Sequence, residues 1–173
     1  MTSTSLEFCV YSKENIPTQE VAKEISSVFI NNYPEIYPEE IRKSDCNRYS
    51  TPEKIQEQVQ NGNAWIVAST NNKIFGIAKF RLENRHHLIN TEEYLLSWII
   101  VDKPHRNKGI AKKILDEYLK ILNKIKRNSN NQIFSIADIH KNNLISRKIF
   151  KNIGCKEGVG KSPEFILAKK EIL

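Results

Sequence analysis

A short basic turn between a hydrophobic run and an amphipathic segment constrains this chain more than any other feature. Residues 94–101 are β-branched and aromatic-rich, which is typical of a buried strand. After the turn, apolar residues recur at three- and four-residue spacing and predict a helix with one apolar face: Ile110, Ile114, Leu115, Tyr118, Leu119, Ile121 and Leu122. A strand, a tight turn and a helix point several backbone N–H groups at one place, where the helix dipole adds roughly half a positive charge. The segment therefore predicts an anion site, and phosphate is the usual ligand.

The residues of the turn favour a phosphate ligand and exclude two common kinds of phosphate site. Gly109 lets a ligand approach the backbone closely, and Lys108, Lys112 and Lys113 add positive charge. A P-loop would require G-x-x-x-x-G-K-S/T, and no pair of glycines here has that spacing and sequel. A dinucleotide-binding turn would require G-x-G-x-x-G, whereas the chain has six glycines and no such cluster.

The turn resembles the acyl-coenzyme A site of the GNAT superfamily of N-acetyltransferases. Residues 106–111 (Arg-Asn-Lys-Gly-Ile-Ala) fit that family's R/Q-x-x-G-x-G/A pattern after a strand. Residues 143–155 are similar to its second coenzyme motif, N-x-x-A/S-x-x-x-Y/F-x-x-L/I-G. Upstream, two strand-like runs at 64–70 and 74–80 flank Asn71-Asn72-Lys73 and predict a hairpin with a glycine in its second strand. The three matches occur in the family's order, and the resemblance spans about residues 62 to 155.

The resemblance implies an α/β (α+β) fold with a mixed, mostly antiparallel sheet and helices on both faces, in the order β-α-α-β-β-β-α-β-α-β. It implies acetyl-CoA as cosubstrate, with the loop's backbone amides on the pyrophosphate and strand amides on the thioester carbonyl. The residues that it assigns to coenzyme binding are Ile99, Ile100, Val101, Arg106, Asn107, Lys108, Gly109, Ile110, Ala111, Lys112, Asn143 and Phe150. Many relatives carry Tyr where this chain has Phe150, so the common proton donor for the departing thiolate is missing.

Length and composition indicate one soluble globular domain over residues 1–173, with 39% hydrophobic and 27% charged residues. The polar start has neither the basic flank nor the apolar core of a signal peptide. Cys9, Cys46 and Cys155 are odd in number and widely spaced, which favours reduced thiols in a cytoplasmic compartment. We expect no metal, because the adjacent His86 and His87 have no further ligands at suitable spacing.

The net charge of +7 has two explanations. A basic rim would attract the several negative charges of coenzyme A. A nucleic-acid-binding protein would also be basic, but it usually adds aromatic platforms, whereas Tyr94, Trp98, Phe134 and Phe150 fall in predicted strand and helix cores. Coenzyme binding is therefore favoured, with no nucleic-acid or membrane partner expected.

The remaining elements follow from caps and periodicity. Residues 6–11 alternate as a first strand, Thr18 opens an amphipathic helix, and Thr51-Pro52 starts another that ends by Gly62. Residues 31–50 predict a loop, in which a short helical piece is an open alternative, and residues 83–91 predict a polar link. Strands are expected at 132–139 and near 165–168, with a helix between them that runs through the second motif and carries Phe150. Tyr118 fits the apolar core face of the earlier helix that follows the turn.

Candidate catalytic residues lie near the entrance of the strand 94–101 and in the polar link before it. Glu93, at the entrance of the strand 94–101, is a candidate base, although a solvated charge at a strand end is the competing interpretation. Tyr94 is a candidate acid, against an ordinary core or surface tyrosine. His86 and His87 are weaker candidates at a cleft rim.

The resemblance thus implies transfer of an acetyl or acyl group from acetyl-CoA to a small-molecule or peptide amine by direct attack in a ternary complex. The alternative, which Phe150 keeps open, is a coenzyme-binding sensor without transferase activity. The acceptor side is expected between residues 16 and 62, where Glu35, Glu39 and Glu40 could attract a cationic amine. The acceptor itself and the oligomeric state cannot be read from the sequence.

Overall fold

The computed structural model describes residues 6–35, 37–71, 73–83 and 89–173. Within them the chain forms strands, α-helices and one short 3₁₀ turn, η1. The elements are β1 (Glu7–Tyr11), α1 (Gln19–Asn31), α2 (Glu39–Arg48), α3 (Pro52–Gln60), β2 (Asn63–Thr70), β3 (Lys73–Leu82), β4 (Thr91–Val101), η1 (Lys103–His105), α4 (Ile110–Arg127), β5 (Gln132–His140), α5 (Leu144–Asn152), β6 (Lys156–Val159) and β7 (Phe165–Ile172).

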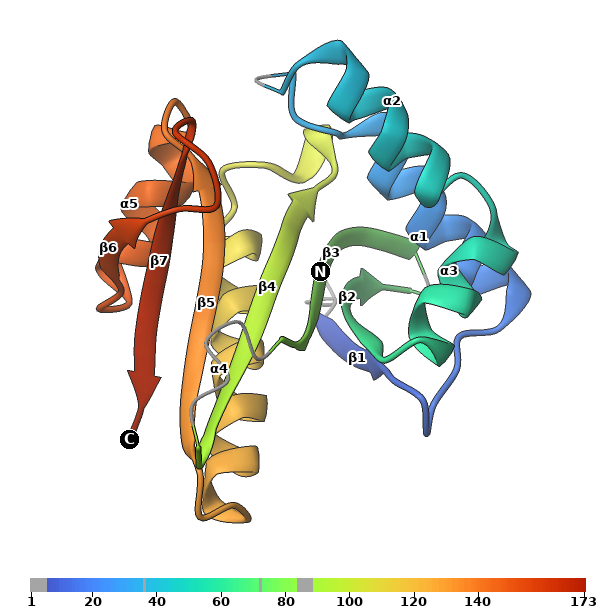
Figure 1. Cartoon of the computed structure of the whole chain (residues 1–173). Helices are drawn as coiled ribbons and strands as arrows, with labels where there is room; N and C mark the ends of the chain where they lie inside the picture. Colours follow the sequence, from blue (N-terminus) through green and yellow to red (C-terminus); the bar gives the residue numbers. More distant parts are fainter. Residues whose placement is uncertain (1–5, 36, 72, 84–88) are drawn as a thin grey trace. The chain divides into compact units, whose positions relative to one another are not determined.

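The strands form a mixed sheet, which confirms the predicted fold class. Their order is β1-β2-β3-β4-β5-β7-β6 (Figure 1). β4 and β5 pair in parallel, whereas β1 with β2, β5 with β7, and β6 with β7 pair antiparallel. None of the helices in the described ranges is long and apolar enough to cross a membrane.

The chain divides into two compact units. The first comprises residues 1–79 and 98–117, and the second residues 80–97 and 118–173. β3, β4 and α4 therefore each contribute residues to both units. The expectation of one domain over residues 1–173 stays a prediction, and each unit is described by itself.

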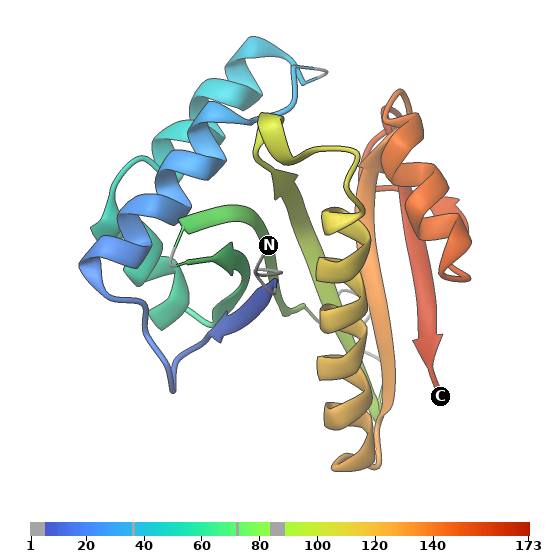
Figure 2. The ribbon, with the colours of Figure 1, turned by 180° about the vertical axis from the view of Figure 1, so that it is seen from behind.

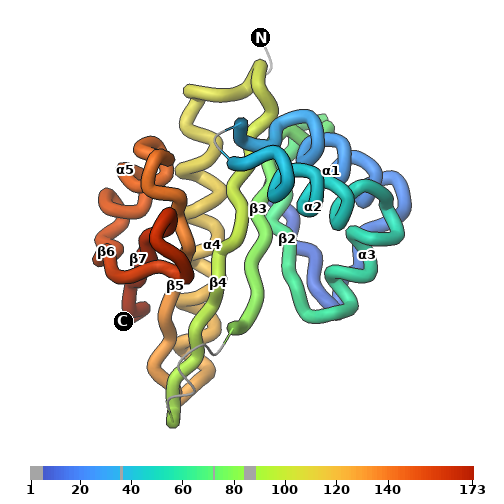
Figure 3. Tube along the Cα trace, turned by 45° about the horizontal axis from the view of Figure 1, so that its top comes forward, coloured from blue at the N-terminus to red at the C-terminus, as the bar shows by residue number. Residues whose placement is uncertain are grey.

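The first unit is built on capped helices and an aromatic core. The Thr18 side chain accepts a hydrogen bond from Val21 N at the start of α1, and Thr51 caps α3 in the same way, with Pro52 in its first turn. α1 packs against α3, and α3 against β2 (Figure 3). Phe29 of α1 lies at the centre of the core, with ring contacts to Tyr33, Tyr49, Trp65 and Trp98. These packed rings hold the end of α1 and the end of β4 together.

The second unit is organised around β5. Its register with β4 runs from Thr91–Gln132 to Leu95–Ile136, and β7 pairs along its whole length. The second half of α4 lies along β5 (Figure 2). Its Tyr118 side chain is fully buried. The Tyr118 hydroxyl donates a hydrogen bond of 2.9 Å to the Tyr94 carbonyl oxygen, which confirms Tyr118 as a core residue of its helix.

The structure differs from the expected elements in three places. Residues 39–48 form a ten-residue helix, α2, in the segment expected to be a loop with a short helical piece as an alternative. β4 begins at Thr91, so it takes in the end of the expected polar link and both Glu92 and Glu93. The short strand β6 was not expected, because all four of its residues are exposed.

Candidate functional site

The turn between β4 and α4 has an unusual backbone. β4 ends at Val101, η1 follows, and α4 starts at Ile110. Asn107 and Gly109 both have positive φ, 62° and 74°. Asn tolerates this left-handed conformation better than most residues, and Gly adopts it without steric cost. Left-handed residues in a turn direct successive N–H groups into a concave cradle that suits an anion.

Open space and positive charge surround this cradle. A Cβ built on Gly109 would have no heavy atom within 4 Å, so a ligand can reach the backbone there. Arg106, Lys108, Lys112 and Lys113 are exposed around it. The first turn of α4 contains no acidic side chain that could satisfy its N–H groups. The turn is therefore suited to an external anion such as a phosphate.

Close packing of α4 on β3 holds the helix N-terminus in place. Gly76 of β3 faces this helix, and a Cβ built on it would lie 2.8 Å from Ile114 Cδ1 and 3.1 Å from Ile110 Cγ2. Both isoleucines are buried. The glycine expected in the second strand of the hairpin thus permits the close approach of α4.

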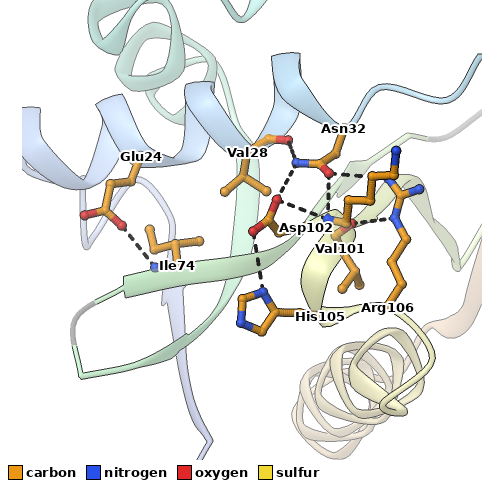
Figure 4. Close-up of polar contacts among 9 residues, drawn as sticks. Glu24, Val28, Asn32, Ile74, Val101, Asp102, His105 and Arg106 are labelled. Atoms are coloured by element: carbon orange, nitrogen blue, oxygen red, sulfur yellow. Dashed lines mark hydrogen bonds and ion pairs between the residues drawn. The ribbon is translucent and has the colours of Figure 1, made fainter.

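Hydrogen bonds anchor the turn to β3 and β4. The Asp102 N–H donates to the Phe75 carbonyl oxygen at 2.8 Å. Arg106 Nε donates to the Val101 carbonyl oxygen at 3.0 Å, as Figure 4 shows. Arg106 Nη2 also lies 3.4 Å from Asn32 Oδ1. Arg106, predicted to contact the coenzyme, therefore bonds back to the protein and stabilises the turn.

His105 lies at the base of the turn. Its ring stacks on Phe75 with centroids 4.9 Å apart and planes 23° apart. Its Nδ1 is 3.4 Å from Asp102 Oδ2, an ion pair when the imidazole is protonated. Both contacts belong to the scaffold of the turn.

The strand residues predicted to face the thioester lie directly before the turn. Ile100 is buried in the core of the first unit, whereas Ile99 and Val101 are partly exposed. The structure thus gathers Ile99 to Val101 and Arg106 to Lys112 in the first unit.

Asn143 and Phe150 lie on the second unit. Asn143 is the N-cap of α5, and its Oδ1 accepts a hydrogen bond of 3.0 Å from Ser146 N, as expected for a capping residue. Phe150 is 6% exposed on the same helix. Their contacts with coenzyme stay predictions.

Glu93 is buried, so its interpretation as a solvated strand-end charge is wrong. It is 2% exposed, and its Oε1 lies 2.7 Å from Lys169 Nζ of β7. That ammonium also lies 4.1 Å from the Phe134 ring centroid. Glu93 is therefore a buried residue of β4 with a charged partner on β7.

Tyr94 donates a hydrogen bond of 2.8 Å from its hydroxyl to Glu92 Oε2. Burial, followed by this bond to Glu92, raises the pKa of Tyr94 well above its ordinary value. Tyr94 is therefore a weaker acid than a free tyrosine. The assignments of Glu93 as base and Tyr94 as acid stay predictions.

The remaining candidates are the histidine pair and the acidic residues of the expected acceptor side. His86 and His87 fall outside the described residues. Glu35, Glu39 and Glu40 are exposed, and Glu39 forms an ion pair of 2.8 Å with Lys43 within α2. In the part of the chain that the structure describes, no group of three or more His, Cys, Asp or Glu could hold a metal ion.

Two residues of the site were missed by sequence reasoning. Asn32, the residue after α1, and Asp102, the residue after β4, face each other beneath the turn. Asp102 precedes Lys103-Pro104 and caps η1, a pattern that the sequence does offer. Asn32 lies 70 residues away from it and gives no comparable pattern.

The family comparison agrees with this fold and turn. The model described as the acetyltransferase (GNAT) family matches residues 22–155, so most of the chain is covered. The chain belongs to this family. A comparison with curated protein sequences finds no match.

Solved structures show the same fold at low sequence identity. PaiA N-acetyltransferase from Thermoplasma acidophilum, in complex with coenzyme A, is 18% identical with a TM-score of 0.72 and coverage of 96% of this chain and 99% of that chain. An acetyltransferase of the GNAT family from Streptococcus pneumoniae is 15% identical, TM-score 0.66, covering 98% and 100%. PH1933 from Pyrococcus horikoshii is 22% identical, TM-score 0.66, covering 95% and 98%.

Proposed function

We propose that this protein is an N-acetyltransferase that transfers the acetyl group of acetyl-CoA to an amine, with the coenzyme's pyrophosphate bound by residues 106–111 and the first turn of α4. The observation that carries the proposal is the pair of left-handed residues, Asn107 and Gly109, directly before a helix N-terminus without acidic side chains. Family membership supports it, as does the coenzyme A in the complex of the relative from T. acidophilum.

The reaction needs no covalent enzyme intermediate. The lone pair of a neutral amine attacks the thioester carbonyl carbon, a C–N bond forms and the C–S bond breaks. The amine nitrogen loses a proton, and the electron pair of the broken bond leaves on the coenzyme's sulfur. Backbone N–H groups of β4 near Ile99 to Val101 are the proposed donors to the carbonyl oxygen as it gains charge.

Proton transfer requires a base for the amine and a proton source for the departing thiolate. Glu93 is the proposed base, because it is a buried carboxyl group of β4, the strand whose later residues are the proposed donors to the thioester carbonyl. Phe150 cannot donate a proton to the thiolate, and the raised pKa of Tyr94 makes that hydroxyl a weak donor. A free thiol has a pKa of about 8.5, so the thiolate can also leave without an acid and take its proton from water.

A second candidate is a coenzyme-binding module without transferase activity. The observation that favours it is Phe150, which is buried and lacks the hydroxyl that many relatives carry there. Both candidates require coenzyme binding and differ only in turnover.

Two measurements separate the candidates. Titration calorimetry with acetyl-CoA should give a dissociation constant in about the micromolar range, and no binding at millimolar coenzyme would end both proposals. A thiol-release assay over a panel of small amines, polyamines, amino acids and peptides should then find an acceptor that is modified by 42 Da, about the mass of one acetyl group less one hydrogen. Binding without thiol release across the panel would favour the second candidate.

A further inference from the structure

We propose that Asn32 is a positioning residue that fixes the coenzyme turn, and that the affinity for acetyl-CoA depends on it through that turn. This inference rests on the proposed function. It concerns a residue at the end of α1, far in sequence from every motif that indicates coenzyme binding.

The Asn32 side chain uses its full hydrogen-bonding capacity. Nδ2 donates to the Val28 carbonyl oxygen at 3.0 Å and to Asp102 Oδ1 at 3.1 Å. Oδ1 accepts from Lys103 N at 2.9 Å and faces Arg106 Nη2 at 3.4 Å. A side-chain amide has two N–H donors and two oxygen lone pairs, so no capacity remains (Figure 4). Asn32 is 6% exposed, so these bonds are made where water does not replace them readily.

The partners require an amide at this position. The Asp102 carboxylate and the Val28 carbonyl can only accept, whereas the Lys103 N–H and the Arg106 guanidinium can only donate. An Asp at position 32 would place a second acceptor against the Asp102 carboxylate. A Ser has a single hydroxyl in place of the amide's separate NH₂ and oxygen, and a Leu would bond to none of the four partners. Each of these changes would therefore cost bonds on the turn side.

Asp102 connects Asn32 to the turn through hydrogen bonds. Its N–H is bound to the Phe75 carbonyl oxygen, and its Oδ1 also accepts a hydrogen bond of 3.1 Å from Lys103 N. These bonds fix the start of η1, and Arg106 follows η1 directly. The Arg106 guanidinium bonds to the Val101 carbonyl oxygen through Nε and to Asn32 Oδ1 through Nη2. Asn107 follows, the first left-handed residue of the cradle.

Asn32 itself has a rigid support. The adjacent Tyr33 is 6% exposed and packs on Trp98 of β4, with ring centroids 5.1 Å apart. Phe29, one helical turn earlier, packs on the same Trp98 ring at 5.6 Å. Since a site built on rigid elements loses less entropy on binding, a fixed turn should bind phosphate more tightly than a loose one.

The matched pair Asn32→Ala and Asn31→Ala tests the proposal. Asn31 is the neighbouring residue, is exposed, and donates only to Ser27 Oγ at 3.1 Å within its own helix. We expect Asn32→Ala to weaken acetyl-CoA binding about tenfold or more in calorimetry, and to raise the KM for acetyl-CoA while kcat at saturating coenzyme changes less than about twofold. Asn31→Ala should bind as the wild type does. A loss of folded protein alone would lower kcat and leave KM unchanged.

The Asp102 variants give an independent test, should Asn32→Ala not fold. Asp102→Ala removes both side-chain bonds of that residue to Asn32 and Lys103, so coenzyme binding should weaken to a similar extent, whereas Asp102→Asn keeps an accepting oxygen and should retain most of the affinity. Wild-type affinity in folded Asn32→Ala, or in folded Asp102→Ala, would overturn the inference. Absence of binding to the wild type would instead overturn the proposed function.

Discussion

Arg106 belongs to the coenzyme motif, and its side chain stabilises the backbone of the turn that is proposed to bind the coenzyme. Its Nε is committed to the Val101 carbonyl oxygen, five residues back, and closes the turn upon the end of β4. The exposed charges that remain for a phosphate belong to Lys108, Lys112 and Lys113. Main-chain N–H groups and lysines would therefore make the primary contacts, with Arg106 holding their geometry.

Gly109 allows charge to be tested separately from bulk. Gly109→Glu and Gly109→Lys share the cost of a side chain at φ 74°, and the space above the residue admits both. We expect Gly109→Glu to abolish detectable acetyl-CoA binding and Gly109→Lys to retain part of it, because only the former places a negative charge where the pyrophosphate binds. Calorimetry on the two variants, with circular dichroism as a control for folding, makes the comparison. Equal affinities in two folded variants would show that the charge of the site does not matter.

The Glu93–Lys169 pair is asymmetric in burial, and this predicts asymmetric costs. Lys169→Met removes the ammonium that lies 2.7 Å from a carboxylate that is 2% exposed, whereas Glu93→Gln removes the carboxylate beside an ammonium whose side chain is 29% exposed. We expect about 2–4 kcal/mol of lost unfolding free energy for Lys169→Met and about 1 kcal/mol for Glu93→Gln. Urea unfolding measures both, and the reverse order would contradict the burial argument.

The same Glu93→Gln variant tests the proposed base. If the Glu93 carboxylate removes the proton of the amine, kcat should fall by about 100-fold or more while the affinity for acetyl-CoA is kept. An unchanged kcat would limit Glu93 to its structural role in β4.

At the scale of elements, the seating of α4 on β3 depends on the missing side chain of Gly76. Gly76→Val should lower the unfolding free energy by about 1–3 kcal/mol and weaken coenzyme binding, because α4 must move away from β3 and carries its N-terminus with it. Gly158→Val in β6 is the control, since the nearest atom to a Cβ there is 3.9 Å away. Thermal unfolding and calorimetry follow both variants.

A second change in the Gly76→Val variant tests the contact itself. Replacing Ile114 by Val there removes the Cδ1 atom that lies 2.8 Å from a Cβ at position 76, and should restore part of the lost stability and affinity. No restoration would mean that this contact does not set the position of the helix.

Elements with a regular apolar pattern or a cap could be predicted from the sequence, and elements without them could not. Thr18 and Thr51 marked the starts of α1 and α3, because each accepts a bond from the first helical turn. α2 has no buried residue and starts after Pro38 without a side-chain cap, so its sequence carries no helical period. β4 was predicted three residues short, because a charged residue at a strand end indicates solvent unless its distant partner is known.

The candidate site divides in the same way. The residues of the turn, 106–111, follow each other in sequence, so their pattern revealed them. Asn32 and Asp102 come together only through the packing of α1 beside β4, 70 residues apart, and no local pattern reports such a contact. The contact between Glu93 and Lys169 likewise joins residues 76 positions apart.

At the scale of the whole molecule, the buried thiol of Cys155 links stability to alkaline pH. Burial raises the pKa of Cys155 from 9.0 to about 11, partly offset by the nearby charge of Lys170. Between pH 9 and 11 the unfolded chain releases this proton and the folded chain keeps it, so the unfolding free energy should fall as the pH rises through this range. Urea unfolding of wild type and Cys155→Ala in reducing buffer measures the difference, and the variant should show the shallower decline. Identical slopes would contradict the assignment of that thiol.

The central claim is that main-chain N–H groups of the turn hold the pyrophosphate of acetyl-CoA. The most direct measurement is the change in amide chemical shifts of the ¹⁵N-labelled protein on titration with coenzyme A and, separately, with pantetheine, which lacks the phosphates. We predict that coenzyme A moves the amide signals of Asn107 to Lys112 most, and that pantetheine leaves them in place. Coenzyme A binding that leaves these six amide signals unmoved would contradict the account.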